Sequence, residues 1–170
     1  AATAAGAREG GEKGVQRSSG LVHRPIRERW LKGDREVVRE YLRIAHLARM
    51  GKRAFLDKEW DVLGELMVEN HDIQRDLGGS GPENERLIQA ALDGGALGAK
   101  LAGAGGGGTI IALTRDPEPV IAKLKEADAS RILYPEPSPG VTVRAIVSSA
   151  DWENAEEELR ARLHPEDFDA

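Results

Sequence analysis

The sequence predicts an α+β protein in which a block of helices precedes a small antiparallel sheet with helices packed on it. Three observations predict this class. Apolar residues between positions 24 and 92 recur at the three- and four-residue spacing of helices. From residue 99 onward the pattern changes to short β-rich runs that are bounded by turn residues and interrupted by one helix. A last helical segment, with Trp152, Ala155, Leu159 and Leu163 on one face, ends the chain.

Four helices are expected in the first block. Pro25 suits the first turn of a short helix that ends near Leu31, and Asp34 is expected to cap a longer helix after it. Asp57 begins a third helix, and Pro82 opens a fourth. The expected buried stripe of the second helix consists of Val38, Tyr41, Leu42, Ala45 and Ala48, and its solvated side of Arg35, Glu36, Arg39, Arg43 and Lys52.

The second part of the chain is expected to hold the sheet. The predicted strands are Ala99–Ala102, Thr109–Leu113, Arg131–Tyr134 and Val141–Val147. A helix that starts at Asp116-Pro117 lies between the second and third of them.

Composition excludes several classes of protein. A chain of 170 residues suits one domain with a real core, and no apolar run approaches the ~18 residues that cross a bilayer. The absence of cysteine excludes disulfides and thiolate metal sites, and the first twenty residues contain no secretory signal, so we expect a cytoplasmic protein without a membrane partner. Residues 151–170 carry eight acidic and two basic side chains, so most of the chain's net charge of −5 lies in this tail. The remaining body is near-neutral, which argues against a nucleic-acid partner.

Three segments are expected along the chain. Residues 1–13 hold only small and charged side chains and are expected to form a disordered leader or remnant, in a chain that does not start with Met and is therefore expected to be a processed product or a fragment. Residues 14–150 form the main domain, and residues 151–170 form an acidic helix and tail to which no function is attached.

The stretch from Lys100 to Thr109 is the most informative part of the sequence. Consecutive glycines weaken a fold unless the backbone needs positive φ or a ligand must approach it, and successive bare amides can form a nest for an anion. The stretch is not a Walker A loop, because Gly108 is followed by Thr109-Ile110, and not a dinucleotide loop, because a strand follows it. The residues alone leave two readings open, a phosphate-binding turn and a purely structural hairpin connection.

The glycine stretch lies within a longer pattern. Residues 95–113, GALGAKLAGAGGGGTIIAL, resemble the third conserved motif of the GHMP small-molecule kinases, which include galactokinases, homoserine kinases and mevalonate kinases. Shorter stretches that are similar to other parts of the same family are residues 14–22, 66–71, 81–88 and 137–141. The resemblance covers roughly residues 14–147 and favours the sugar or heptose-phosphate kinase branch.

The resemblance implies a fold and an activity. It implies a ferredoxin-like antiparallel sheet and the C-terminal half of an enzyme that transfers phosphate from ATP, with Mg²⁺, to a hydroxyl of a sugar or sugar-phosphate. The family's ATP-wrapping loop and catalytic Asp belong to an N-terminal half that this sequence does not contain, so we expect no catalytic residue and no metal ligand here and an inactive isolated chain. The expected partners are that missing half, in cis or as a separate chain, the sugar substrate, and a second copy in a homodimer.

The resemblance also assigns site residues. The residues implied to line the transfer site or bind phosphate are Gly103, Ala104, Gly105, Gly106, Gly107, Gly108, Arg17, Ser18 and Ser19. For the last three, capping of the following helix is an equal alternative. Lys100, Asn70 and His71 are candidates for the substrate side, against the simpler readings of a solvated strand lysine and hydrogen-bonded helix residues.

Two other functions stay open. The chain could be a non-catalytic binding or dimerisation module of the same fold, because fold alone does not determine function. It could also be a domain of a mevalonate kinase-like enzyme.

Overall fold

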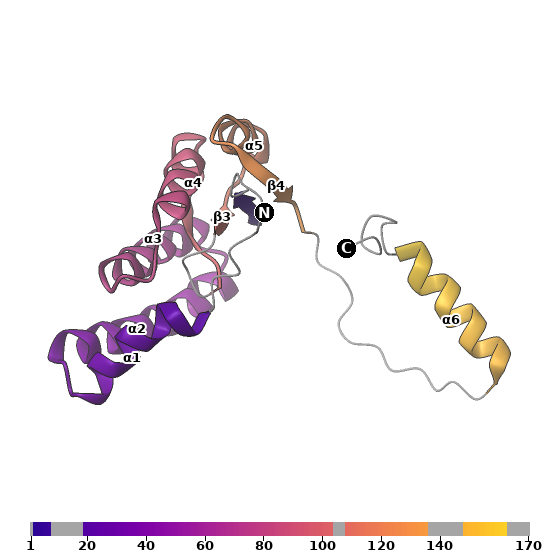
Figure 1. Cartoon of the computed structure of the whole chain (residues 1–170). Helices are drawn as coiled ribbons and strands as arrows, with labels where there is room; N and C mark the ends of the chain where they lie inside the picture. Colours follow the sequence, from indigo (N-terminus) through magenta and orange to yellow (C-terminus); the bar gives the residue numbers. More distant parts are fainter. Residues whose placement is uncertain (1, 8–18, 104–107, 136–147, 163–170) are drawn as a thin grey trace. The chain divides into compact units, whose positions relative to one another are not determined.

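The computed structural model describes residues 2–7, 19–103, 108–135 and 148–162. The chain forms two compact units, Ala1–Pro135 and Glu136–Ala170. The first unit holds a four-stranded sheet and five helices among its described residues, and the second holds one helix (Figure 1).

The sheet of the first unit is antiparallel throughout, as predicted. Its strands are β1 (Ala2–Ala7), β2 (Gly98–Leu101), β3 (Thr109–Leu113) and β4 (Ala129–Leu133), and they lie in the order β2-β3-β1-β4. β2 and β3 pair from Gly98 opposite Leu113 to Leu101 opposite Ile110. The strand predicted at residues 141–147 lies outside the described residues.

β1 corrects the expectation of a disordered leader. Ala2–Ala7 pairs with β3 on one side and β4 on the other, with an irregularity between Gly6 and Ala7 at β4. Its small residues show no apolar alternation, so the segment gives no strand signal of its own. Two flanking strands supply backbone partners that local sequence does not reveal. The rest of the expected leader lies outside the described residues.

The helices follow the predicted order, with differences at their starts. They are α1 (Ser19–Leu31), α2 (Arg35–Leu56), α3 (Trp60–Asp76), α4 (Pro82–Asp93) and α5 (Pro117–Glu126). The expected cap is confirmed, because the Asp34 carboxylate accepts from the backbone N–H groups of Glu36 and Val37 at 3.0 and 3.5 Å. α1 begins six residues before Pro25, which therefore lies inside the helix and not in its first turn.

The buried stripe predicted for α2 is wrong. The helix buries Val37, Glu40, Leu47 and Ala54, whereas the side chains of Tyr41 and Leu42 are exposed. Both series have helical spacing. The true stripe contains a glutamate, whose burial depends on ion pairs with Arg39 at 2.8 Å and Arg43 at 3.1 Å that the apolar pattern does not show.

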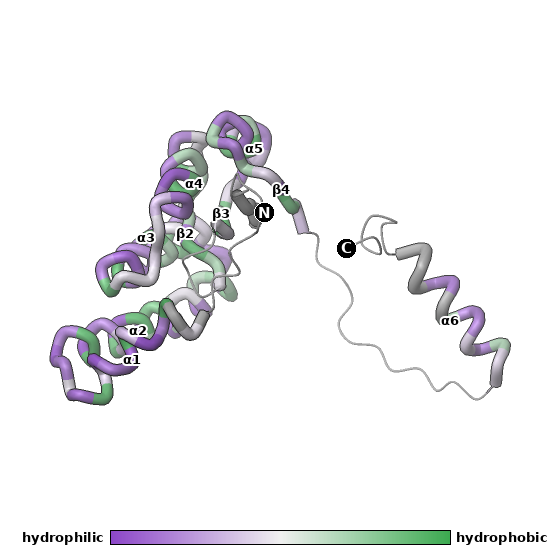
Figure 2. Tube along the Cα trace, viewed as in Figure 1, coloured by the Kyte–Doolittle hydropathy of each residue, from purple (hydrophilic) through white to green (hydrophobic). Residues whose placement is uncertain are grey.

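Two apolar clusters hold the first unit together. One lies between the sheet and helices α4 and α5, and the other lies among α1, α2 and α3 (Figures 1 and 2). The first cluster consists of Leu87, Ile88, Ala91, Ala99, Ile110, Ala112, Val120 and Leu124. The second consists of Ile26, Val37, Leu47, Ile73 and Leu77. The glycine stretch follows β2, which contributes Ala99 to the first cluster.

Helix α3 lies against β2 with backbone nearly touching backbone. A Cβ on Gly98 would collide with the carbonyl of Gly64, and a Cβ on Gly64 would collide with the carbonyl of Leu97. Only glycine permits this approach, which brings α3 close enough to hydrogen-bond the end of β2.

The second unit contains α6 (Ser149–Arg162). Its start is capped by Ser148, whose hydroxyl accepts from the Asp151 backbone N–H at 3.2 Å and donates to the Asp151 carboxylate at 2.7 Å. Trp152, expected on a packed face, is 59% exposed.

Candidate glycine-turn site

The glycine stretch connects two neighbouring strands of the sheet. The Ala102 N–H donates to the Thr109 carbonyl at 2.9 Å, and Gly103 turns the chain with a φ of +73°. The connection between antiparallel strands confirms that the turn is not a dinucleotide loop. Ala104, Gly105, Gly106 and Gly107 lie outside the described residues, so their role in anion binding stays a prediction.

His71 lies beside the start of this turn. Its side chain is buried in α3, and its Nδ1 accepts from the Leu101 backbone N–H at 3.4 Å. Its Nε2 lies 3.0 Å from Oε1 of Glu85 on α4. Burial lowers the pKa of His71, against the opposing effect of the Glu85 carboxylate. The buried hydrogen-bonded position fits the simpler of the two roles considered for this residue, and it joins three elements at the turn.

Glu85, the partner of His71 Nε2, makes a second hydrogen bond. Its Oε1 also accepts from the Ser80 hydroxyl, at 2.5 Å. A serine nucleophile requires the histidine in the middle, between serine and carboxylate, whereas here the carboxylate is in the middle. The three side chains therefore form a structural linkage rather than a catalytic triad. Sequence reasoning missed Ser80 and Glu85, because their five-residue separation is not that of a capping box and Gly81 occupies the N-cap of α4.

Lys100 and Asn70 line one cavity between α2, α3 and β2. Apolar side chains form its other walls, among them Leu47, Leu63 and Met67. The Lys100 ammonium donates to the Leu101 carbonyl at 3.0 Å, and burial lowers its pKa. The prediction of a solvated strand residue is therefore wrong, because the side chain is half-buried. Asn70 accepts from the Gln74 side chain at 2.5 Å.

The remaining predicted phosphate contacts are residues 17–19, at and before the start of α1. Arg17 and Ser18 are outside the described residues, and Ser19 is the first residue of α1. Within the described ranges, His, Asp and Glu side chains form no group that could hold a metal ion. No described helix is long and apolar enough to cross a membrane.

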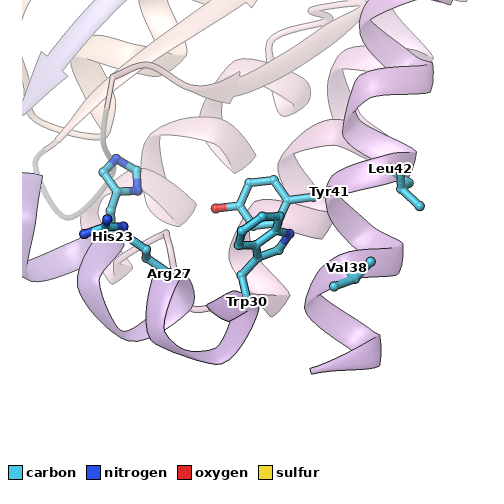
Figure 3. A pocket seen from close by; sticks show the side chains of 6 residues that line it. All are labelled: His23, Arg27, Trp30, Val38, Tyr41 and Leu42. Atoms are coloured by element: carbon cyan, nitrogen blue, oxygen red, sulfur yellow. The ribbon is translucent and has the colours of Figure 1, made fainter. Parts of the chain in front are cut away.

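A second hollow lies between α1 and α2 (Figure 3). Trp30, Val38, Tyr41 and Leu42 form its apolar lining, with His23 and Arg27 at its margin. Three of these residues belong to the stripe that the sequence predicted to be buried. The predicted stripe of α2 is therefore apolar but faces this hollow instead of the core.

Asn84 is a buried polar residue that the sequence analysis did not single out. It is 1% exposed, and neither its Nδ2 nor its Oδ1 has a hydrogen-bond partner. It precedes Leu87 and Ile88 on the buried face of α4, one turn closer to the helix start.

Comparison with known proteins gives a family match over this region. Residues 52–130 match the family model described as GHMP kinases C terminal. The matched range contains α3, α4, β2, β3 and the glycine turn.

Named relatives match the same part of the chain. The chain is 40% identical over 91 residues to probable glucuronokinase 2 of Arabidopsis thaliana, a match that covers 52% of this chain and 25% of that protein. It is 45% identical over 60 residues to mevalonate kinase of Thermococcus gammatolerans, covering 35% of this chain and 18% of that protein. The chain therefore spans only a minor part of these relatives.

Solved structures share the fold. The L. major mevalonate kinase in complex with R-mevalonate aligns with a TM-score of 0.68 and 27% identity over 78% of this chain and 40% of that one. The Lactococcus lactis galactokinase complexed with galactose aligns with a TM-score of 0.57 and 19% identity over 78% of this chain and 43% of that one.

Proposed function

We propose that this chain, whose residues 52–130 match the family model described as GHMP kinases C terminal, is the second half of an ATP-dependent kinase that phosphorylates a hydroxyl of a sugar or sugar-phosphate. The observation that carries the proposal is the glycine turn between β2 and β3, which lies within the matched range. Phosphoryl transfer depends on positioning and charge stabilisation. A turn of bare backbone amides suits the second task.

We assign roles first to the residues of the glycine turn and then to the residues around it. Gly103–Gly108 lines the transfer site, and Arg17, Ser18 and Ser19 approach the phosphates from the start of α1 and the residues before it. Arginine offers several donors in a fork, and serine offers a hydroxyl, so both suit anionic oxygens. Lys100 and Asn70 share a cavity beside β2, which supports a place on the substrate side.

The preferred substrate class is a sugar. The matches to the two Arabidopsis glucuronokinases, at 40% and 37% identity over 91 residues, favour a sugar acid as the first candidate. Six mevalonate kinases match at 36–53% identity, so a mevalonate kinase-like domain is the second candidate.

ATP and Mg²⁺ would be held largely outside this chain. Glu85, the carboxylate in contact with His71, already accepts from Ser80. The described residues therefore do not supply a donor set for Mg²⁺, and we assign its ligands to the N-terminal kinase half. That half is the proposed partner, in cis or as a separate chain. A homodimer and a cytoplasmic location complete the proposal.

The test is a coupled assay of ADP formation with ATP, Mg²⁺ and a panel of glucuronate, galactose, sugar phosphates and mevalonate. The chain is assayed alone and together with the proposed N-terminal kinase half. We expect sugar-dependent ADP formation only with both halves. Turnover by the isolated chain would contradict the proposed division of labour. No turnover with any acceptor would favour the non-catalytic binding module, and turnover with mevalonate alone would favour the second candidate.

A further inference from the structure

The cavity between α2, α3 and β2 is lined by described residues only. Its volume is about 230 Å³, below the ~300–1,000 Å³ of sites for drug-sized ligands, so it suits a small molecule. Lys100 of β2 and Asn70 of α3 are its polar residues. The rest of the lining consists of Leu47, Ala48 and Gly51 from α2 and Leu63, Leu66 and Met67 from α3.

The apolar walls follow from helix geometry. Leu63, Met67 and Asn70 follow one another at spacings of four and three residues, so they lie on one face of α3. Gly51 on α2 has no side chain, and a Cβ there would already lie 3.6 Å from the Leu63 side chain. The missing side chain therefore helps to keep the space between the two helices open.

Lys100 brings a positive charge to this apolar lining. Its side chain is half-buried, and its Nζ donates to the Leu101 carbonyl at 3.0 Å. Burial lowers the pKa of Lys100, and no described carboxylate opposes this effect. The ammonium has three N–H bonds, so one described acceptor leaves it with donors to spare. A carboxylate in the cavity would accept from it and offset the cost of burying its charge.

Asn70 supplies a second donor. Its Oδ1 accepts from the Gln74 side chain at 2.5 Å, and no described residue accepts from its Nδ2. One ammonium and one amide match the single negative charge and the two oxygens of a carboxylate. A phosphate dianion would instead leave an unbalanced charge among apolar groups, which is costly.

We propose that this cavity is a binding site for a small apolar carboxylic acid, whose carboxylate meets the Lys100 ammonium and the Asn70 amide and whose alkyl part lies on the apolar walls. The site goes beyond the proposed function, because it requires neither ATP nor a second kinase half. It shares Lys100 and Asn70 with the proposed substrate side, so the experiment includes a sugar acid that tells the two assignments apart.

The two methionines of the chain provide the readout. Met67 lines the cavity, whereas Met50 on α2 does not line it and is 41% exposed. The full chain is labelled with ¹³C at the methionine methyl groups, and the two NMR signals, assigned with Met50→Leu, are followed during titration with hexanoate. We expect a saturable shift of the Met67 signal with a Kd of about 1–10 mM, the range for so small a ligand, and little change at Met50.

Three further ligands separate the parts of the proposed acid. Hexan-1-ol keeps the alkyl chain without the charge, and acetate keeps the carboxylate without the chain. Each should bind at least about tenfold more weakly than hexanoate, because the first loses hydrogen bonds of a charged group and the second loses the burial of methylene groups. Glucuronate should also bind more weakly than hexanoate, because the apolar walls offer no partners for its hydroxyls.

Lys100→Met removes the charge and keeps an unbranched side chain. It should weaken hexanoate binding at least about tenfold and leave the affinity for hexan-1-ol within about twofold, a pattern that unfolding would not produce. Lys52→Met is the matched control, because Lys52 is an exposed lysine next to Gly51 that does not line the cavity. It should change the affinity for hexanoate by less than about twofold.

Equal binding of hexanoate and hexan-1-ol by the wild type overturns the proposal, and this comparison needs no variant. No shift at Met67, equal shifts at Met67 and Met50, or equal weakening in the two lysine variants also overturns it. Tighter binding of glucuronate than of hexanoate overturns the apolar acid and supports the proposed substrate side. If hexanoate binds as expected while the two kinase halves give no turnover with any acceptor, the cavity site is supported and the proposed function is contradicted.

Discussion

Gly64 and Gly98 are tightly constrained because backbone meets backbone where α3 crosses β2. A methyl group on Gly64 would collide with the Leu97 carbonyl, and the backbone has little freedom to withdraw. We expect Gly64→Ala to destabilise the protein by about 1–3 kcal/mol, the typical cost of overpacking and the backbone shifts that it forces. Urea unfolding measures the change.

The matched control is Gly51→Ala in α2, where the new methyl group meets only the Leu63 side chain at an ordinary 3.6 Å. Alanine has the higher helix propensity, so this variant should be neutral or about 0.5–1 kcal/mol more stable. Equal destabilisation of the two variants would argue against the close approach of α3 and β2.

The titration of His71 gives a prediction for stability. The folded state holds the pKa of His71 below its ordinary value near 6.5 because the side chain is buried, whereas the unfolded chain has the ordinary pKa. Below pH 6.5 the unfolded state therefore binds more protons than the folded state. The contribution of His71 to stability is fully present above pH 6.5 and is lost as the pH falls below it, through the lowered folded pKa.

The measurement compares urea unfolding of the wild type and His71→Asn from pH 8 to pH 5. The wild type should lose stability more steeply below pH 6.5, since asparagine does not titrate. Parallel curves for the two proteins would count against a buried neutral His71.

At the scale of elements, strong local signals predicted most of the fold. Asp34 and Asp116 cap α2 and α5, and Pro82 opens α4, because capping and proline geometry act over a few residues. The stripe of α2 could not be predicted, because burial of Glu40 depends on arginine partners that become visible only in the folded helix. β1 could not be predicted either, because its neighbours in the sheet lie more than a hundred residues away.

The ion pairs of Glu40 give the prediction at this scale. Its carboxylate is 12% exposed and contacts both Arg39 and Arg43, and Arg43 continues to Glu69 on α3 at 2.6 Å. Glu40→Gln leaves two arginines beside a neutral amide, and we expect a loss of about 1–3 kcal/mol. Glu69→Gln, at a carboxylate that is 44% exposed, is the control and should cost much less because solvent screens the pair. Thermal unfolding at low and high salt tests both, and a larger loss in Glu69→Gln would contradict the ranking.

For the whole molecule, the place of the glycine turn between two paired strands was predicted, whereas the contacts that join different elements beside it were missed. The glycine turn is recognisable from its consecutive glycines, but the hydrogen bonds from Leu101 through His71 to Glu85 and Ser80 join residues on different elements. Asn70 and His71 are adjacent in the sequence but have different surroundings. Asn70 lines the cavity beside Lys100, whereas His71 is buried against β2.

The glycine turn should therefore matter more for turnover than for folding. In the proposed two-part kinase, Gly106→Val adds a β-branched side chain where an anion is expected to approach bare backbone. The described members of the apolar cluster beneath the sheet lie on α4, α5, β2 and β3. We expect kcat of the reconstituted enzyme to fall at least about tenfold, which corresponds to about 1.4 kcal/mol of transition-state stabilisation, with a much smaller change in unfolding free energy. Loss of melting temperature in step with loss of activity would instead identify the turn as a structural hairpin, and a variant with normal turnover would remove the turn from the transfer site.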